Sequence, residues 1–156
     1  MSNMEHFKGF SLVDGDIKIN VNLKRFENQI SDAQFYLDSQ IMNDMVPYMP
    51  MQTGTFINNT RARSAVYAGT GKVIAAASPY GRYLYMGKVM VNSKSGKGPR
   101  LIPGVGLRYP AGATLVATER DLTYSNPNAT ARWFNTAKQV HGTQWVDEVK
   151  KRAGGK

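Results

Sequence analysis

The sequence predicts an α+β fold in which a small antiparallel sheet is packed by a long N-terminal helix and a C-terminal helix, with a long extended loop. Three observations predict this fold. An apolar stripe at helical spacing lies near the N-terminus, the middle is rich in turn signals and β-formers, and a mostly aromatic stripe closes the chain. The length of 156 residues suits a single domain that spans residues 1–156.

The first residues are predicted to lead into a helix without belonging to the core. Residues 1–16 are mixed in character and are interpreted as an N-terminal arm. Residues 17–22 alternate apolar and polar side chains, which predicts a short strand.

A helix is predicted over residues 23–45, because apolar side chains recur there at steps of three and four residues. Asn22 is a candidate N-cap. Pro47 and Pro50 end the helix, since proline has no amide hydrogen to donate. We expect the stripe to pack against the sheet. Its predicted core members include Phe26, Ile30, Leu37 and Ile41.

The segment after the helix is predicted to be mainly β-structure. A Thr-Gly turn at residues 53–54 leads to a predicted strand over 56–63. The Gly-Thr-Gly sequence at 69–71 predicts a hairpin between two further strands. After Pro79, residues 80–91 fit either another strand or a short helix, and the pattern leaves both open.

Residues 92–113 are predicted to form a long basic loop, because glycine and proline recur throughout them. One more strand is predicted within residues 113–125. A final helix then runs to residue 152, capped by Asn128 or Thr130, with Gly142 as a possible bend. Its aromatic face is predicted to add Trp133, Phe134 and Trp145 to the core.

Charge is distributed unevenly along the chain. The formal net charge is +9, and no Asp or Glu occurs between Asp44 and Glu119. The same interval holds nine Lys or Arg residues, so it accounts for the whole surplus. Such a surplus predicts an acidic partner, either nucleic acid or an acidic protein surface.

The sequence argues against an enzyme, and no cofactor or metal site is expected. The chain has no cysteine and two histidines, His6 and His141, at no metal-ligand spacing. Glu119 and Asp121 flank a predicted strand end without a nucleophile or second acid cluster. The Gly-Lys pairs lack the spacing and the hydroxyl residue of a phosphate-binding P-loop. Neither a signal peptide nor a membrane span is predicted.

A binding surface is the better interpretation, because residues 81–100 combine aromatic and basic side chains. Three explanations stay open: ordinary sheet packing with a solubilising loop, a nucleic-acid surface, or a loop that orders against a neighbouring subunit. The candidate interface residues are Tyr80, Arg82, Tyr83, Tyr85, Lys88, Lys94, Lys97, Arg100 and Arg108.

Several segments, in order from about residue 46 to residue 152, together resemble the minor capsid and tail-completion (neck) proteins of tailed bacteriophages. They are VPYMPMQTGTFINNT, SPYGRYLYMGKVMV, LTYSNP and WFNTAKQVHGTQWVDEVKK. The chain departs from the pattern at Gly81, where alanine is usual, and at Met86, where an aromatic residue is usual.

The resemblance implies a structural virion protein at the head–tail junction, made in the host cytoplasm and without an active site. It implies a homo-oligomeric ring that contacts adjacent neck, connector and tail proteins and surrounds the genomic DNA. On this hypothesis Tyr80, Tyr83 and Tyr85 anchor the subunit contact. The loop over 92–108 reaches an acidic protein neighbour or the DNA-bearing lumen. We favour the neighbour, because strong phosphate contacts would hold DNA that must slide. The alternative is a basic nucleic-acid-binding module outside any particle.

Overall fold

The computed structural model describes residues 10–14, 17–51, 53–77 and 81–154. The fold is α+β, as the sequence predicts. The elements follow in the order β1 (Phe10–Asp14), β2 (Ile17–Val21), α1 (Lys24–Met45), η1 (Val46–Tyr48), α2 (Thr55–Ala65), α3 (Gly81–Met86), β3 (Lys88–Asn92), β4 (Arg100–Ile102), β5 (Gly106–Arg108), β6 (Leu115–Asp121) and α4 (Trp133–Arg152).

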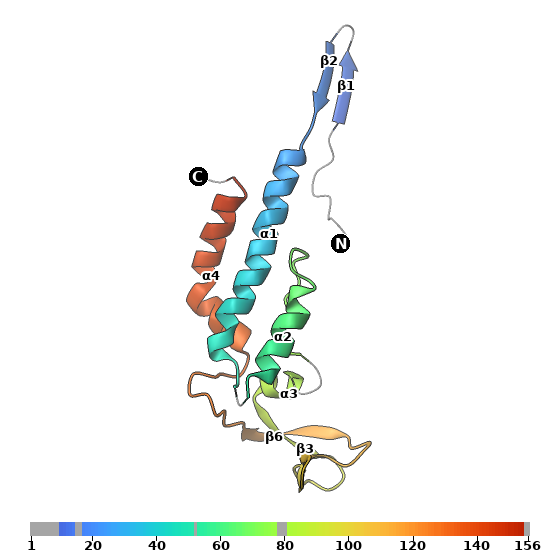
Figure 1. Cartoon of the computed structure of the whole chain (residues 1–156), viewed down its shortest axis with the longest axis vertical. Coiled ribbons are helices and arrows are strands. Elements are labelled where there is room, and N and C mark those ends of the chain that lie inside the picture. Colours follow the sequence, from blue (N-terminus) through green and yellow to red (C-terminus); the bar gives the residue numbers. More distant parts are fainter. Residues whose placement is uncertain (1–9, 15–16, 52, 78–80, 155–156) are drawn as a thin grey trace.

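The molecule is elongated, with a helical body between two β-ribbons (Figure 1). Helices α1, α2 and α4 form the body. The hairpin of β1 and β2 extends beyond one end of α1, and β3 and β6 leave the opposite end. Within the described residues the strands form three separate two-stranded antiparallel sheets, β1–β2, β3–β6 and β4–β5, instead of one small sheet. Of the predicted N-terminal arm, residues 1–16, the structure describes residues 10–14, and these form strand β1.

The apolar stripe of α1 packs against α4, not against a sheet as the sequence led us to expect. Two polar contacts fix the helices side by side. The Trp145 indole Nε1 donates to Asp44 Oδ2 at 2.6 Å, and the Arg152 guanidinium lies 3.7 Å from the Tyr36 ring centroid. Leu23 occupies the N-cap position of α1, but the Asn22 side chain still accepts a hydrogen bond from the Lys24 amide at 2.9 Å.

The core lies where α1, α2 and α4 meet. Its buried residues are Met42, Met45, Met49, Ile57, Trp133, Ala137 and Trp145, with Leu37, Ile41 and Phe134 packed against them. Ile30 is only half-buried. The prediction that Phe26 belongs to the core is wrong, because 54% of this residue is exposed. Phe26 lies in the first turn of α1.

The strand predicted over 56–63 is instead helix α2. Gly54 precedes it with a φ of 76°, a conformation that favours glycine, and accepts the Asn58 amide at 2.9 Å. The buried positions Ile57, Thr60 and Ser64 recur at three and four residues, which is helical spacing. Two of these three side chains are polar, so a search for apolar periodicity could not detect this face.

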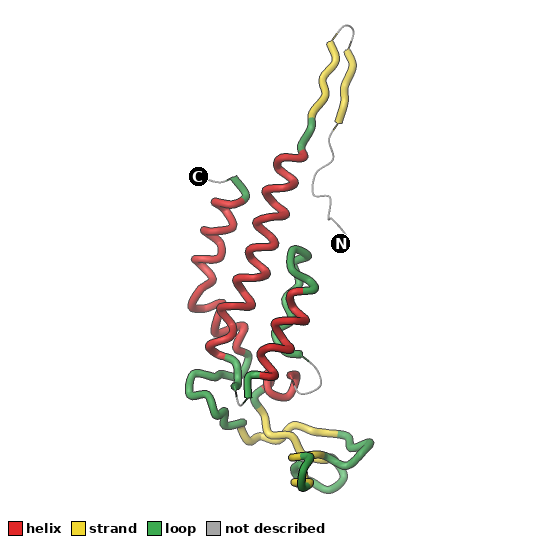
Figure 2. The backbone as a smooth tube through the Cα atoms, in the orientation of Figure 1, coloured by secondary structure: helices red, strands yellow, loops and turns green. Residues whose placement is uncertain are grey.

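The hairpin predicted at Gly69–Gly71 is also wrong. This turn follows α2, and the segment after it returns along the body without forming a strand (Figure 2). The returning segment is positioned by hydrogen bonds to side chains and not by a strand ladder. The Trp133 indole donates to the Ala75 carbonyl at 2.8 Å, and Thr60 Oγ1 accepts the Ala77 amide at 3.2 Å.

The turn itself is anchored by a buried carboxylate on α1. Asp38 is 4% exposed, and its Oδ2 accepts the amide hydrogens of Gly69 and Gly71 at 2.8 and 3.0 Å. Both glycines have positive φ values, which lets the two amides converge on one oxygen. The other oxygen, Oδ1, accepts the Gln34 side-chain amide at 2.8 Å.

For residues 80–91 the sequence left a strand and a short helix open, and the structure contains one of each. Helix α3 ends at Met86, and strand β3 begins at Lys88. Helix α4 starts after Arg132, which has a φ of 52°, so neither Asn128 nor Thr130 is its cap. Gly142 lies inside α4, which continues unbroken to Arg152.

Candidate functional site: the basic arm

The segments that carry the phage resemblance meet at one end of the helical body. The Asn126 side-chain amide donates to the carbonyls of Pro47 and Met49 at 3.2 and 2.9 Å. The Thr130 amide donates to the Tyr48 carbonyl at 3.1 Å. We call the cluster formed by residues 47–51, 83–87 and 124–133 the basal junction.

One of the predicted interface tyrosines, Tyr85, packs within the basal junction. The Tyr85 ring lies edge-on to Trp133 with centroids 4.8 Å apart, and its carbonyl accepts the Arg132 amide at 2.8 Å. The Tyr124 hydroxyl donates to the Leu84 carbonyl at 2.6 Å. Burial raises the pKa of both tyrosines above the ordinary value. Tyr85 therefore contributes to the fold, and a part for it in a subunit contact stays a prediction.

Close packing requires glycine at two positions, Gly81 at the start of α3 and Gly87 at the basal junction. A Cβ on Gly81 would lie 2.7 Å from the Ala76 carbonyl carbon, so alanine would not fit there without a shift. Gly87 has a φ of 69°, and a Cβ on it would lie 2.4 Å from the Ala131 Cβ. Gly87 is the last residue before β3.

Residues 88–121 form a projection from the basal junction, which we call the basic arm (Figure 2). The chain enters the arm after Gly87 and returns at Leu122, whose amide donates to the Gly87 carbonyl at 2.9 Å. Strands β3 and β6 form its stem, with Lys88 opposite Asp121 and a register shift between Lys88 and Met90. The predicted strand within 113–125 is thus β6.

The first basic residue of the arm is engaged within the stem. Lys88 Nζ forms an ion pair with Asp121 Oδ1 at 2.6 Å and also donates to the Glu119 carbonyl at 3.3 Å. The hydrogen bond to Asp121 raises the Lys88 pKa. The Lys88–Asp121 ion pair thus joins β3 to β6 at the base of the arm.

Beyond the stem, the arm contains two ordered turns where the sequence predicts a loop. In the first, the Gly96 amide donates to the Asn92 carbonyl at 2.8 Å, and the Asn92 amide to the Lys97 carbonyl at 2.9 Å. Lys94 and Lys97 are exposed on this turn. In the second, β4 and β5 form a hairpin in which Arg100 lies opposite Arg108.

The hairpin is attached to the stem by Tyr109, whose hydroxyl donates to the Met90 carbonyl at 2.6 Å. Burial raises the Tyr109 pKa. The loop prediction for 92–113 was wrong in this part, because strands of three residues interrupted by glycine and proline give no periodic signal.

The predicted interface residues therefore fall into separate groups. Lys94, Lys97, Arg100 and Arg108 lie on the part of the basic arm beyond its β3–β6 stem, residues 93–114, which we call the outer arm. Lys88 lies in the stem, and Arg82, Tyr83 and Tyr85 lie on α3. Tyr80 lies outside the described residues. Sequence reasoning missed the exposed apolar residues of the hairpin, Leu101, Ile102 and Val105. Their signal was a short apolar sequence between exposed basic residues and glycines.

The described part of the chain contains no group of three or more His, Cys, Asp and Glu residues that could hold a metal ion. His141 packs between the rings of Tyr48 and Trp145, each centroid 6.5 Å away.

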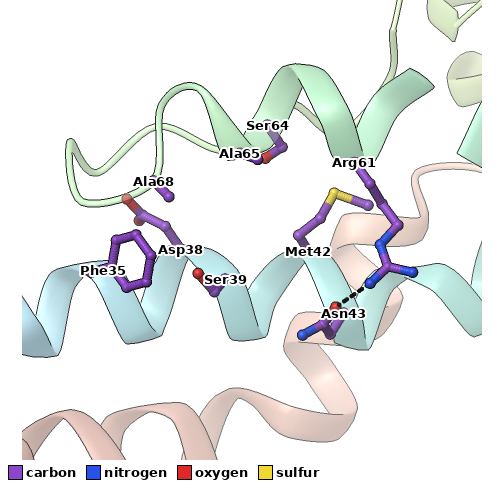
Figure 3. Close-up of a pocket in the computed structure, with 9 residues that line it drawn as sticks. All are labelled: Phe35, Asp38, Ser39, Met42, Asn43, Arg61, Ser64, Ala65 and Ala68. Atoms are coloured by element: carbon purple, nitrogen blue, oxygen red, sulfur yellow. Dashed lines mark hydrogen bonds between the residues drawn. The ribbon is translucent and has the colours of Figure 1, made fainter. Parts of the chain in front are cut away.

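A shallow hollow of about 190 Å³ opens between α1 and α2 (Figure 3). Phe35 and Met42 line it, and Arg61 at its edge donates to Asn43 Oδ1 at 3.2 Å. Asp38 also borders the hollow, but both its oxygens accept hydrogen bonds. The hollow therefore has no paired nucleophile and base.

Comparisons with protein-family models, with curated proteins and with solved structures found no match for this chain. None of the described helices combines the length and the apolar character that a membrane span needs.

Proposed function

We propose that this chain is a structural protein of a tailed-phage neck, where copies form a ring that joins the DNA-filled head to the tail. One observation carries the proposal: a helical body with its own core bears an outer arm whose cations and apolar side chains are exposed. Such a division suits a protein that acts by assembly. The neck itself is suggested by the resemblance.

The contacts at the basal junction support treating the resemblance as one feature. Asn126, from the Leu-Thr-Tyr-Ser-Asn-Pro segment, binds the backbone of the Val-Pro-Tyr-Met-Pro segment. Trp133, which opens the last segment, packs on Tyr85 of the Ser-Pro-Tyr-Gly-Arg segment. Segments far apart in sequence thus form one structural unit. A shared unit is a stronger basis for a family proposal than four separate short matches.

The shape of the chain supports a ring. Its two ends are different, since the β1–β2 hairpin extends from one and the basic arm from the other (Figure 1). A head-to-tail contact joins two different surfaces of the same chain, and such contacts close into rings when the rotation between copies allows it. In this proposal the DNA passes through the middle, and adjacent neck, connector and tail proteins lie above and below.

The proposal is tested by electron microscopy of lysates from a phage that lacks this gene. DNA-filled heads beside separate finished tails are expected, because the joint would be missing. The matched control supplies the gene from a plasmid and should restore joined particles. Complete infectious particles without the gene would overturn the proposal.

A second candidate is a basic nucleic-acid-binding module outside any particle, favoured by the interval from Asp44 to Glu119 without acidic residues. It predicts that the isolated chain binds a duplex of about 30 base pairs with submicromolar affinity that falls steeply with salt. A titration at two salt concentrations distinguishes the candidates, because the neck proposal expects weak binding by the isolated chain.

A further inference from the structure

The hairpin of the basic arm presents apolar side chains to solvent. Leu101 is 73% exposed, Ile102 44% and Val105 55%. We call these three residues the hairpin tip. Leu101 and Ile102 are consecutive in β4, so they lie on opposite faces of the hairpin. Apolar surface is therefore exposed on both faces, and the described part of the chain covers neither.

The hairpin geometry is fixed, which distinguishes the tip from an arbitrary apolar loop. The Val105 amide donates to the Ile102 carbonyl at 3.0 Å, and Gly104 has the positive φ that this turn needs. Tyr109 ties the returning chain to β3. A tip held in one conformation loses little conformational entropy on binding.

Basic residues flank the tip along the chain, with Lys94, Lys97 and Arg100 before Leu101 and Arg108 after Val105. Lys94, Lys97 and Arg100 are exposed, and no carboxylate of the described residues lies within ion-pair distance of them. The sequence between Asp44 and Glu119 contains no acidic residue that could pair with them. An apolar centre with a polar edge is the usual composition of a protein interface, and here every charged residue that flanks the apolar tip between Asp44 and Glu119 is basic.

We infer that the hairpin tip docks into an apolar groove on a different protein of the neck, and that Asp and Glu residues line the edge of this groove. The apolar side chains provide the buried centre. Lys94, Lys97 and Arg100 orient the contact through charge complementarity. The inference rests on the proposed function, which supplies the neck neighbour, and it adds the chemistry that this neighbour must offer.

Two other occupants fit the same surface less well. Phosphates of DNA would engage the cations but leave Leu101 and Val105 in water, so DNA does not account for the apolar tip. A second copy of this chain offers the hollow between α1 and α2, but Arg61 at its edge would repel the basic hairpin. Both are distinguishable outcomes of the test below.

The experiment places the photo-cross-linking residue p-benzoyl-phenylalanine at position 101 of the full chain during infection. After irradiation, cross-linked peptides are identified by mass spectrometry. The expected product is one dominant adduct with a different protein, at a peptide whose neighbouring surface carries Asp or Glu. The control places the same probe at Val140, which is 60% exposed on α4 and should not give this adduct.

Charge reversal then tests the electrostatic part. The variant with Lys94→Glu, Lys97→Glu and Arg100→Glu should lower the adduct yield about tenfold or more. Replacing the mapped partner carboxylates by Lys should restore it. An unchanged thermal midpoint of the triple variant shows that its fold is intact. If replacing the partner carboxylates by Lys does not restore the adduct, the inference that Asp and Glu residues line the groove is wrong.

The remaining outcomes separate the inference from the proposed function. An adduct with DNA or with a second copy, or no adduct at position 101, overturns the inference even if particles lacking the gene fail to join. Conversely, an acidic protein adduct restored by the charge swap, in a phage that assembles normally without this gene, upholds the docking chemistry and overturns the neck proposal.

Discussion

The helical body and the basic arm differ in how their polar groups are satisfied. In the body, Asp38 and Asp44 accept hydrogen bonds from other segments, and both Trp indoles donate to partners within the chain. On the outer arm, Lys94, Lys97 and Arg100 extend into solvent without a carboxylate of the described residues beside them. The polar groups of the body are satisfied within the chain, whereas the cations of the outer arm are exposed to solvent.

Charged residues therefore contribute differently to the body and to the arm. A buried hydrogen bond to a charged group contributes about 1.5–3 kcal/mol to stability, whereas exposed charges contribute little. Substitutions in the body should therefore change folding, and substitutions on the outer arm should change binding alone. The following predictions test this division, beginning with the largest effect on stability.

The largest effect is expected from Gly87→Ala. The added Cβ would meet the Ala131 Cβ at 2.4 Å, and the residue would have to keep a φ of 69°. We expect a loss of about 3 kcal/mol or more in the free energy of unfolding, measured by urea denaturation. The matched control is Gly112→Ala on the arm, where φ is 70° and nothing lies within 4 Å.

Gly112→Ala should cost only about 1 kcal/mol, because it introduces the backbone strain without the clash. Equal losses in the two variants would show that the contact with Ala131 has no energetic role, and the basal junction would then be less tightly packed than described.

A smaller loss is expected from Asp38→Ala, which removes the acceptor shared by the Gly69 and Gly71 amides. Two buried donors would be left without their acceptor, so the free energy of unfolding should fall by about 2–3 kcal/mol. Asp38→Asn keeps one side-chain oxygen and should lose roughly half as much. Identical thermal midpoints for wild type and Asp38→Ala would contradict this assignment.

Alkaline pH should weaken the basal junction through Tyr124. Burial raises its pKa in the folded chain above the ordinary value of 10.0, so the unfolded chain releases its proton first. Its contribution is therefore complete below about pH 10 and is lost as pH rises through the folded pKa.

The measurement is the urea midpoint between about pH 8 and about pH 11, for wild type and for Tyr124→Phe. The variant loses the hydrogen bond to the Leu84 carbonyl and should show a flatter alkaline decline. Parallel declines would assign the alkaline sensitivity to other groups.

The smallest effect on stability is expected from replacing Lys94, Lys97 and Arg100 together with Ala. Exposed side chains without partners contribute little, so the free energy of unfolding should change by less than about 0.5 kcal/mol. The same variant should block particle assembly. A large loss of stability would show that these cations support the fold. Particles that assemble normally yet leak DNA would favour a contact in the lumen.

Sequence reasoning was most reliable where burial follows apolar periodicity. The long helix over 23–45, the final helix and the strand within 113–125 are all present, and Trp133 and Trp145 are buried. Phe26 was misplaced because α1 continues past the partner that covers its stripe. The length of an apolar stripe does not show how far the opposing helix extends.

Prediction failed where polar side chains replace apolar ones in the interior. The face of α2 buries Thr60 and Ser64, and the turn at Gly69–Gly71 is held by Asp38, a residue 31 positions away from Gly69. Neither contact has a local signature. The exposed cations of the arm are visible in the sequence as a run of basic residues, but the exposed apolar residues beside them stand out only once the hairpin is seen as a folded unit.

The hydrogen bond between Leu122 and Gly87 means that the arm begins and ends at one point of the body. A segment attached in this way is topologically an insertion, since a short bridge between those two residues would leave the path of the helices unchanged. The segment can therefore be lengthened, shortened or exchanged while the helical body keeps its architecture.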